Sequence, residues 1–176
     1  GIVMSFQFGT NWSNFSYAAA NFLGPVLSYE VVTAFFLEAA FLGVLLFGRD
    51  KVPAGAHLFA ACMVALGTFI SSFWILSANS WMQTPVGTEL RDGVIHVAAW
   101  SQALFSPSFI YRFAHMGLAS FLTGSFVVAG VSAWYLLRQR ETEANRKALS
   151  VSLWMILILA PVQAVVGDFH GLNTLE

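Results

Sequence analysis

Two acidic residues, Glu30 and Glu38, interrupt a run from Val26 to Gly48 that is otherwise apolar and uncharged. A carboxyl group in such a run is costly inside a membrane, and it usually faces a bundle interior, a ligand or a water path. Eight residues of α-helix separate two positions by about 12 Å along the axis and about 80° around it. The spacing therefore allows both acids on one inward face at different depths, and it favours proton transfer or metal contact.

Each acid also has a simpler interpretation. Glu30 could be an interfacial residue just outside the apolar zone, and Glu38 could be a protonated acid that hydrogen-bonds a neighbouring helix. No basic residue lies within this run to pair with Glu38, so apolar surroundings would favour its neutral form. A neutral acid that can release and regain a proton is suited to a proton relay.

His115 and Ser71 are the other polar candidates in apolar segments. A histidine inside a membrane can bind haem iron, pass protons or hydrogen-bond a neighbouring helix, and all three remain open for His115. Met116 points about 100° away from His115 on a helix and cannot be its axial partner on the same iron. Ser71 could line a polar path with Ser72, although a bond to the carbonyl of the preceding helical turn is the more common role.

The remaining candidate ligands are weaker. His57 begins an apolar segment beside basic residues and is expected at the interface, whereas His96 and His170 fall outside the apolar runs and are expected in water. Cys62 is the single cysteine, so neither a disulfide framework nor a cysteine-based zinc or iron–sulfur site can form within this sequence.

The composition is that of a membrane protein. The 176 residues are 57% hydrophobic and only 10% charged, whereas a soluble domain carries about 25% charged residues. The 17 Phe, 6 Trp and 4 Tyr residues exclude a disordered chain. A net charge of −1 gives no reason to expect a nucleic-acid partner.

Four apolar segments are long enough to cross a bilayer, which takes roughly 20 residues. They predict an all-α integral membrane protein, a single helical bundle with spans near residues 26–48, 56–78, 113–137 and 148–167. We expect an outer loop over residues 79–110 and an interfacial segment over the first 25 residues. The apolar segments do not alternate as the strands of a membrane barrel would.

Basic residues set the predicted orientation, because they collect on the cytoplasmic side. Six of the eight lie in two connections that an even number of crossings separates, and we assign both connections to the cytoplasm: Arg49, Lys51, Arg138, Arg140, Arg146 and Lys147. The outer loop then faces the other side of the membrane.

Five short segments, in this order and spacing, resemble subunit I of the cytochrome bd quinol oxidases. They are Phe6-Gln7-Phe8-Gly9-Thr10-Asn11-Trp12, Ala34-Phe35-Phe36-Leu37-Glu38, Gly48-Arg49-Asp50, the run from Trp74 to Pro85, and Phe113-Ala114-His115-Met116. The tail, residues 168–176, is similar to the start of the family's quinol-binding loop, and it is closer to the cyanide-insensitive branch.

The resemblance implies a terminal respiratory oxidase of the bacterial cytoplasmic (inner) membrane. Such an enzyme oxidises quinol at the outer face, reduces O2 to water and takes up protons from the cytoplasm. It implies low-spin haem b, high-spin haem b and haem d as cofactors, and subunit II, small accessory subunits and membrane lipid as partners.

Roles for single residues follow from the same resemblance. His115 matches an axial ligand of the low-spin haem b iron, and Glu30 matches the acid at the high-spin haems. Glu38 and Ser71 match two groups of the proton path, while Ala39 stands where some members have a serine. We expect the chain to be an internal piece of a longer protein and inactive alone, because other ligands of the family have no counterpart in it.

Two other classes of function compete with an oxidase. A haem b membrane anchor would carry electrons for another subunit and would need paired histidines on facing helices. A proton-coupled transporter without haem would use Glu30 and Glu38 as ion sites, and would be expected to show broken helices or an inverted repeat.

Overall fold

The computed structural model describes residues 2–138 and 142–175. Arg140, one of the predicted cytoplasmic basic residues, lies outside these described residues. The sequence predicts a single membrane domain, and the chain forms two compact units, Gly1–Phe109 and Ile110–Glu176. Each unit has its own helices and its own candidate residues.

Four helical segments are long and apolar enough to cross a membrane, namely Ala20–Phe47, Ala54–Gln83, Trp100–Leu137 and Glu143–Asn173. The prediction of a helical membrane protein with four spans is therefore confirmed. The helices extend several residues beyond the apolar segments, because capping and backbone hydrogen bonding, not hydropathy, set their ends. At Thr142, for example, the hydroxyl oxygen accepts a bond from the Asn145 amide 3.1 Å away and starts the last helix early.

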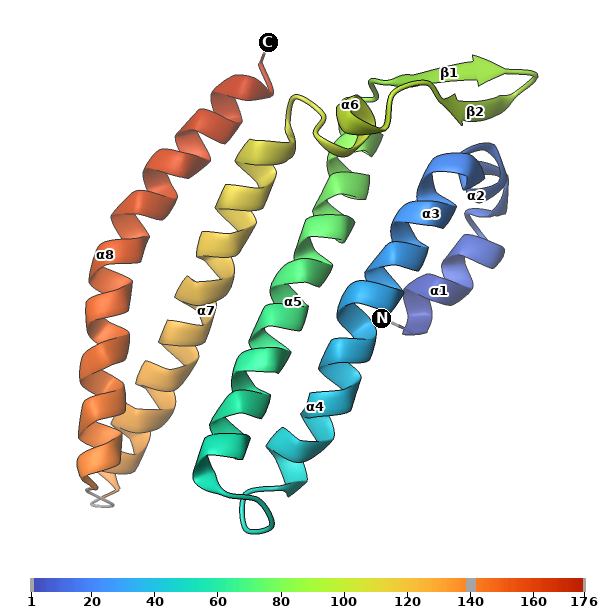
Figure 1. Ribbon diagram of the computed structural model, residues 1–176. Helices are drawn as coiled ribbons and strands as arrows, with labels where there is room; N and C mark the ends of the chain where they lie inside the picture. The colour runs from blue at the N-terminus through green and yellow to red at the C-terminus, as the bar shows by residue number, and fades with distance from the viewer. Residues whose placement is uncertain (1, 139–141, 176) are drawn as a thin grey trace. The chain divides into compact units, whose positions relative to one another are not determined.

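The first unit is built on two antiparallel helical segments (Figure 1). The first is continuous through α3 (Ala20–Glu30), the π-helical turn η1 (Val31–Phe35) and α4 (Phe36–Phe47). It packs along α5 (Ala54–Gln83) after a short connection that holds Arg49 and Lys51. Pro53 precedes α5 in an extended conformation, which suits a residue that cannot donate a backbone hydrogen bond.

The other end of this unit contains more regular structure than the sequence predicts. The first residues form α1 (Ile2–Gly9) and α2 (Ser13–Ala18), not an irregular interfacial segment. The predicted outer loop holds the last turn of α5, the hairpin β1 (Thr88–Arg91) and β2 (Val94–Val97), and α6 (Trp100–Leu104). Asp92 and Gly93 turn the hairpin with φ of 51° and 78°, values that this pair of residues tolerates well.

A small core joins these outer elements to α3 and α5. Seven buried residues form it: Ala19, Phe22, Leu23, Val26, Ala78, Trp81 and Ala103. The rings of Phe22 and Trp81 lie 4.4 Å apart between centroids, and the Asn21 amide donates to the Ile95 carbonyl over 3.1 Å to hold the hairpin on α3. This core fixes the outer ends of the two helices that carry both acids.

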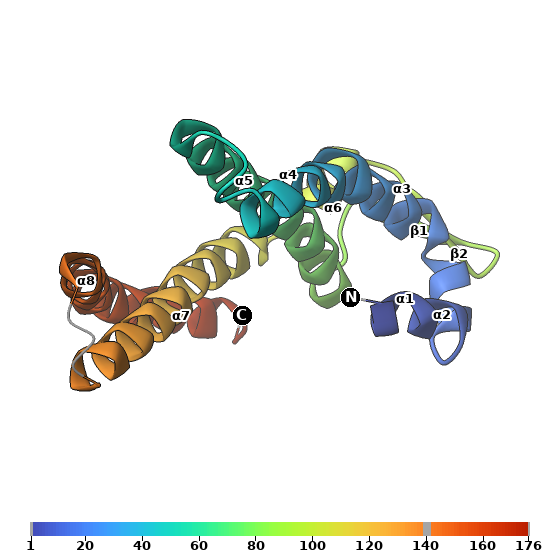
Figure 2. The ribbon, with the colours of Figure 1, turned by 90° about the horizontal axis from the view of Figure 1, so that it is seen from below.

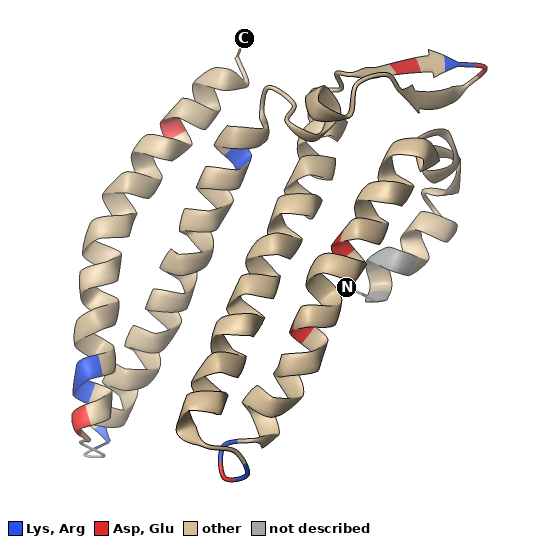
Figure 3. Cartoon of the chain, viewed as in Figure 1, with Lys and Arg blue, Asp and Glu red and all other residues tan. Residues whose placement is uncertain are grey.

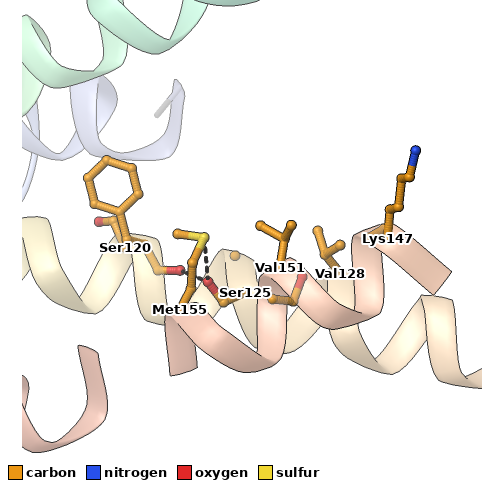
Figure 4. Close-up of a pocket in the computed structure, with 10 residues that line it drawn as sticks. Ser120, Ser125, Val128, Lys147, Val151 and Met155 are labelled. Atoms are coloured by element: carbon orange, nitrogen blue, oxygen red, sulfur yellow. Dashed lines mark hydrogen bonds between the residues drawn. The ribbon is translucent and has the colours of Figure 1, made fainter. Parts of the chain in front are cut away.

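The second unit consists of α7 (Phe109–Leu137) and α8 (Glu143–Asn173), which run antiparallel (Figures 1 and 2). Side chains bridge the two helices, as where the Ser125 hydroxyl donates to the Met155 sulfur over 3.7 Å. An open, mostly apolar groove of about 500 Å³ follows this contact toward Lys147 (Figure 4). Because α8 continues to Asn173, residues 168–173 are helical, and the predicted loop does not begin at Asp168.

Charged side chains cluster near the ends of the long helices (Figure 3). In the run from Ala20 to Phe47 the acidic residues are Glu30 and Glu38, and Glu38 lies in the first turn of α4, well inside the span. The surface hairpin carries an exposed ion pair of 2.6 Å between Arg91 and Glu89. Glu30 and Glu38 therefore differ from the other charged residues, and contact with water at a helix end does not explain their positions.

Candidate functional site

Glu30 and Ser71 face each other across the first unit. The Ser71 hydroxyl on α5 donates to Oε1 of Glu30, at the end of α3, over 2.7 Å. Both residues are half-buried. Ser72, its neighbour, instead bonds back to the Phe69 carbonyl over 2.7 Å, so the common role applies to one serine and not to the other. Glu30 and Ser71 are 41 residues apart, so the sequence alone does not predict this contact.

Glu38 on α4 lies against Gly67 of the facing helix, α5. A Cβ added to Gly67 would lie 2.7 Å from Cγ of Glu38 and 3.3 Å from both the Glu38 nitrogen and the Ala34 carbonyl oxygen. Gly67 is buried, and Ala34 is fully buried between the two acids. Only a residue without a side chain leaves room here for the glutamate stem and the backbone of the facing helix.

The two contacts fall on one face of α5, because Gly67 and Ser71 are four residues apart. Eight α-helical residues would set Glu30 and Glu38 about 80° apart. The η1 turn changes this angle, since a π-turn absorbs one extra residue and leaves about the rotation of seven residues, within about 20° of two full turns. In this turn the Phe36 amide reaches the carbonyl of Val31, five residues back. The π-turn therefore brings both acids onto the face that meets α5.

Aromatic side chains surround the π-turn next to Glu30. The Trp74 indole N–H donates to the Thr33 hydroxyl oxygen over 2.9 Å, and that hydroxyl donates to the Tyr29 carbonyl over 2.6 Å. The rings of Tyr29 and Trp74 are stacked with centroids 5.5 Å apart. These rings border a cavity of about 420 Å³ lined by Pro25, Val26, Tyr29, Trp74, Trp100 and Leu104. Tyr29, the residue before Glu30, thus lines space that a flat, apolar group could enter.

Gly67→Ala should destabilise the intact protein, whereas Gly55→Ala on the same helix should not. The first change forces a methyl group into contact with backbone and with Glu38, and overpacking of this kind costs about 1–3 kcal/mol. The second adds a methyl group in open space. Thermal unfolding of the two variants in detergent measures the difference, and equal midpoints would show that α4 and α5 do not approach closely at Gly67.

His115 lies against α8 in the second unit. Nε2 of Gln163 is 3.2 Å from both ring nitrogens of His115, and a Cβ added to Gly167 would be 3.2 Å from Cε1 of the ring. The centroid of the His170 ring is 5.8 Å from that of His115. The expectation that His170 is solvated is wrong, because α8 continues past it and holds it half-buried toward His115.

The other histidines have structural or surface positions. His57 donates from Nε2 to the Leu45 carbonyl over 2.9 Å, which joins the end of α4 to the start of α5. His96 is exposed on β2. Among the described residues no three His, Cys, Asp or Glu side chains gather as a metal site.

Sequence reasoning missed Gln163 and Gly67. Gln163 carried a usable signal, because it is a polar residue in the largely apolar run 148–167. Gly67 and the π-turn carried none, since neither glycine content nor the residues of Val31–Phe35 distinguish a close approach from ordinary helix. The structure brings Glu30, Glu38 and Ser71 together in the first unit and places His115 in the second.

Comparison with known proteins identifies relatives of the whole chain. The family model for cytochrome bd terminal oxidase subunit I matches residues 1–176. Cytochrome bd ubiquinol oxidase subunit 1 of Bacillus subtilis (strain 168) is 37% identical over 153 residues, which are 87% of this chain and 33% of that protein. Cytochrome bd-II ubiquinol oxidase subunit 1 of Escherichia coli (strain K12) is also 37% identical over 153 residues, covering 86% of this chain and 30% of that one.

A solved structure of a related protein has the same fold. The bd oxidase from Geobacillus thermodenitrificans superimposes with a TM-score of 0.83 and 31% sequence identity, over 98% of this chain and 41% of that one. The chain thus spans about a third of the length of the curated relatives that it matches.

Proposed function

Because this chain belongs to the cytochrome bd terminal oxidase subunit I family, we propose that it carries part of the haem and proton machinery of a quinol:oxygen oxidoreductase. It is a multi-pass protein of the bacterial inner membrane. Members of the family contain haem and work in multi-subunit complexes. In the full-length protein, subunit II and accessory subunits would complete the enzyme, with quinol and O2 as substrates.

The proposed cofactors are low-spin haem b, high-spin haem b and haem d. When bound, they would carry electrons one at a time from quinol and hold the O2 that is reduced. We assign His115 as one axial ligand of the low-spin haem b and Glu30 as the acid at the high-spin haems. Two features of the chain fit these groups. Gln163 Oε1 is a buried atom beside His115 with no hydrogen-bond partner among the described residues, and Tyr29, the residue before Glu30, lines a cavity.

The proton path rests mainly on one observation, the 2.7 Å hydrogen bond from Ser71 to Glu30. A hydroxyl that donates its proton to a carboxylate can accept another proton on its remaining lone pairs. Glu38 lies on the same face, farther along the helix toward the connection with Arg49 and Lys51. Protons entering from that side would reach Glu38 first, and Ser71 and Glu30 after it. Because quinol releases its protons at the outer face, this arrangement would build a proton gradient without a pump.

Two measurements on the full-length complex test the proposal. A reduced-minus-oxidised optical spectrum should contain low-spin b bands together with high-spin b and d bands, and purified complex should consume O2 when given quinol. A b band without high-spin bands would indicate the membrane anchor, and a protein without haem bands would indicate the transporter.

Glu30→Gln should perturb the high-spin haem bands and leave the low-spin band largely intact. The amide keeps the size of the side chain and can still accept a bond from Ser71, but it loses the negative charge that a carboxylate offers to iron. Optical and magnetic circular dichroism spectra of the complex measure the change. Glu89→Gln is the matched control, because that acid is exposed on the hairpin and paired with Arg91. If the variant changes only the affinity for quinol, Glu30 is an interfacial residue and not the acid at the high-spin haems.

A further inference from the structure

The polar side chain of Gln163 contacts the ring of His115. Its amide nitrogen is 3.2 Å from both ring nitrogens, and both residues are half-buried between α7 and α8. The amide oxygen, Oε1, is buried and has no hydrogen-bond partner among the residues that the structure describes. A buried carbonyl oxygen without a donor is costly, so an atom of this kind indicates that a donor is missing.

Metal binding would change which atoms of this pair can bond. A neutral imidazole on a metal uses one nitrogen as the ligand and carries a proton on the other, so neither nitrogen can accept a bond from an amide N–H. The present contact, in which the Gln163 nitrogen faces the ring, could not persist. A half-turn of the amide about its last side-chain bond exchanges nitrogen and oxygen with almost no change of shape.

We propose that Gln163 is the positioning residue of His115, and that its Oε1 accepts the hydrogen bond from the ring N–H when the other ring nitrogen binds haem iron. This inference rests on the proposed role of His115. Metal-bound histidines almost always donate their second N–H to such an acceptor, which sets the ring orientation and makes the imidazole a stronger donor to the metal.

The surrounding residues explain why the ring reaches Gln163. Gly167, one turn farther along α8, leaves room for the ring edge, since a Cβ there would lie 3.2 Å from Cε1. His170 is the rival acceptor, because its Nε2 is also buried without a partner among the described residues. The ring centroids of the two histidines are 5.8 Å apart, whereas Gln163 is already within hydrogen-bond distance.

The midpoint potential of the low-spin haem in the full-length complex tests the proposal. Gln163→Leu removes the acceptor, weakens the imidazole as a donor to oxidised iron and should raise the potential. Gln163→Glu offers a charged acceptor and should lower it. We expect each change to alter the reduction equilibrium about tenfold in opposite directions, which is about 59 mV for a one-electron couple. If the leucine variant loses the haem, the glutamate variant still shows whether the midpoint potential falls as expected.

Two further variants make the outcome decisive. Gln102→Leu, an exposed glutamine on α6, should leave the potential unchanged. If His170→Ala shifts the potential and both Gln163 variants leave it unchanged, the acceptor is His170 and the proposal is overturned. Unchanged potentials in all four variants would also overturn it, while loss of the low-spin band in His115→Ala would still support the proposed function. If His115→Ala keeps the band, the proposed function itself fails.

Discussion

Glu38→Gln in the full-length complex should retain its haems yet lose turnover with quinol and O2 by about a hundredfold or more, the lower end of what a positioned proton-transfer group contributes. Glutamine keeps the size of the side chain next to Gly67 and can still hydrogen-bond, but it cannot exchange a proton. The change therefore separates packing from proton transfer. Oxygen consumption, together with the haem spectrum of the same preparation, measures both quantities.

Two other variants sharpen this result. Glu38→Asp keeps an exchangeable proton on a shorter stem, so it should retain part of the activity with an altered pH profile. Glu89→Gln makes the same chemical change on the exposed hairpin, where the acid pairs with Arg91, and should have no effect. Full oxidase activity in Glu38→Gln, with normal proton uptake from the inner side, would show that the carboxyl group is structural.

His115→Ala should abolish the low-spin b band of the complex while part of the protein still assembles. The helix would lose its imidazole but keep the packing of α7 against α8, because alanine is well tolerated in a helix. Reduced-minus-oxidised spectra of membranes, normalised to the amount of assembled protein, measure the loss. Quinol oxidation should slow as well, since bound haems carry the electrons from quinol in the proposed function.

His96→Ala is the matched control, because His96 is exposed on β2, in the surface hairpin and outside the spanning helices. It should leave every haem band in place. A low-spin band that survives in His115→Ala would remove His115 from the iron site and would leave its contact with Gln163 as a simple interhelical hydrogen bond.

Composition and hydropathy were enough to predict the number and class of the helices, because backbone N–H and C=O groups in lipid must be hydrogen-bonded within the chain, which leaves few alternatives. The ends of the helices were not predictable in the same way. Thr142 starts α8 before the apolar run begins, and α8 continues past Asp168 to Asn173. Caps and tertiary contacts decide such boundaries, and hydropathy does not report them. The Asp92-Gly93 pair favours the turn of a two-residue hairpin, but the apolar pattern predicted only an outer loop over residues 79–110.

For the candidate site, sequence could identify unusual residues but not their partners. Glu30 and Glu38 stand out because a carboxylate in an apolar run is rare, yet nothing in the sequence pairs Glu30 with Ser71, 41 residues away. The predicted angle between the two acids was also different, because the estimate assumed regular α-helix through Val31–Phe35. A π-turn depends on how a helix packs against its neighbour, which a single sequence does not reveal.

The π-turn also bears on how this stretch of chain can vary between relatives. Removing one residue from an ordinary spanning helix rotates everything beyond it by about 100° and would turn one acid toward lipid. Here the loss of one residue from Val31–Phe35 would convert the π-turn to regular α-helix and leave both acids facing α5. A spacing of seven residues in regular α-helix and a spacing of eight residues that includes the π-turn give nearly the same rotation between the two acids. A one-position gap between the two glutamates in an alignment of relatives would therefore preserve the geometry, and a correct alignment should place that gap inside the turn.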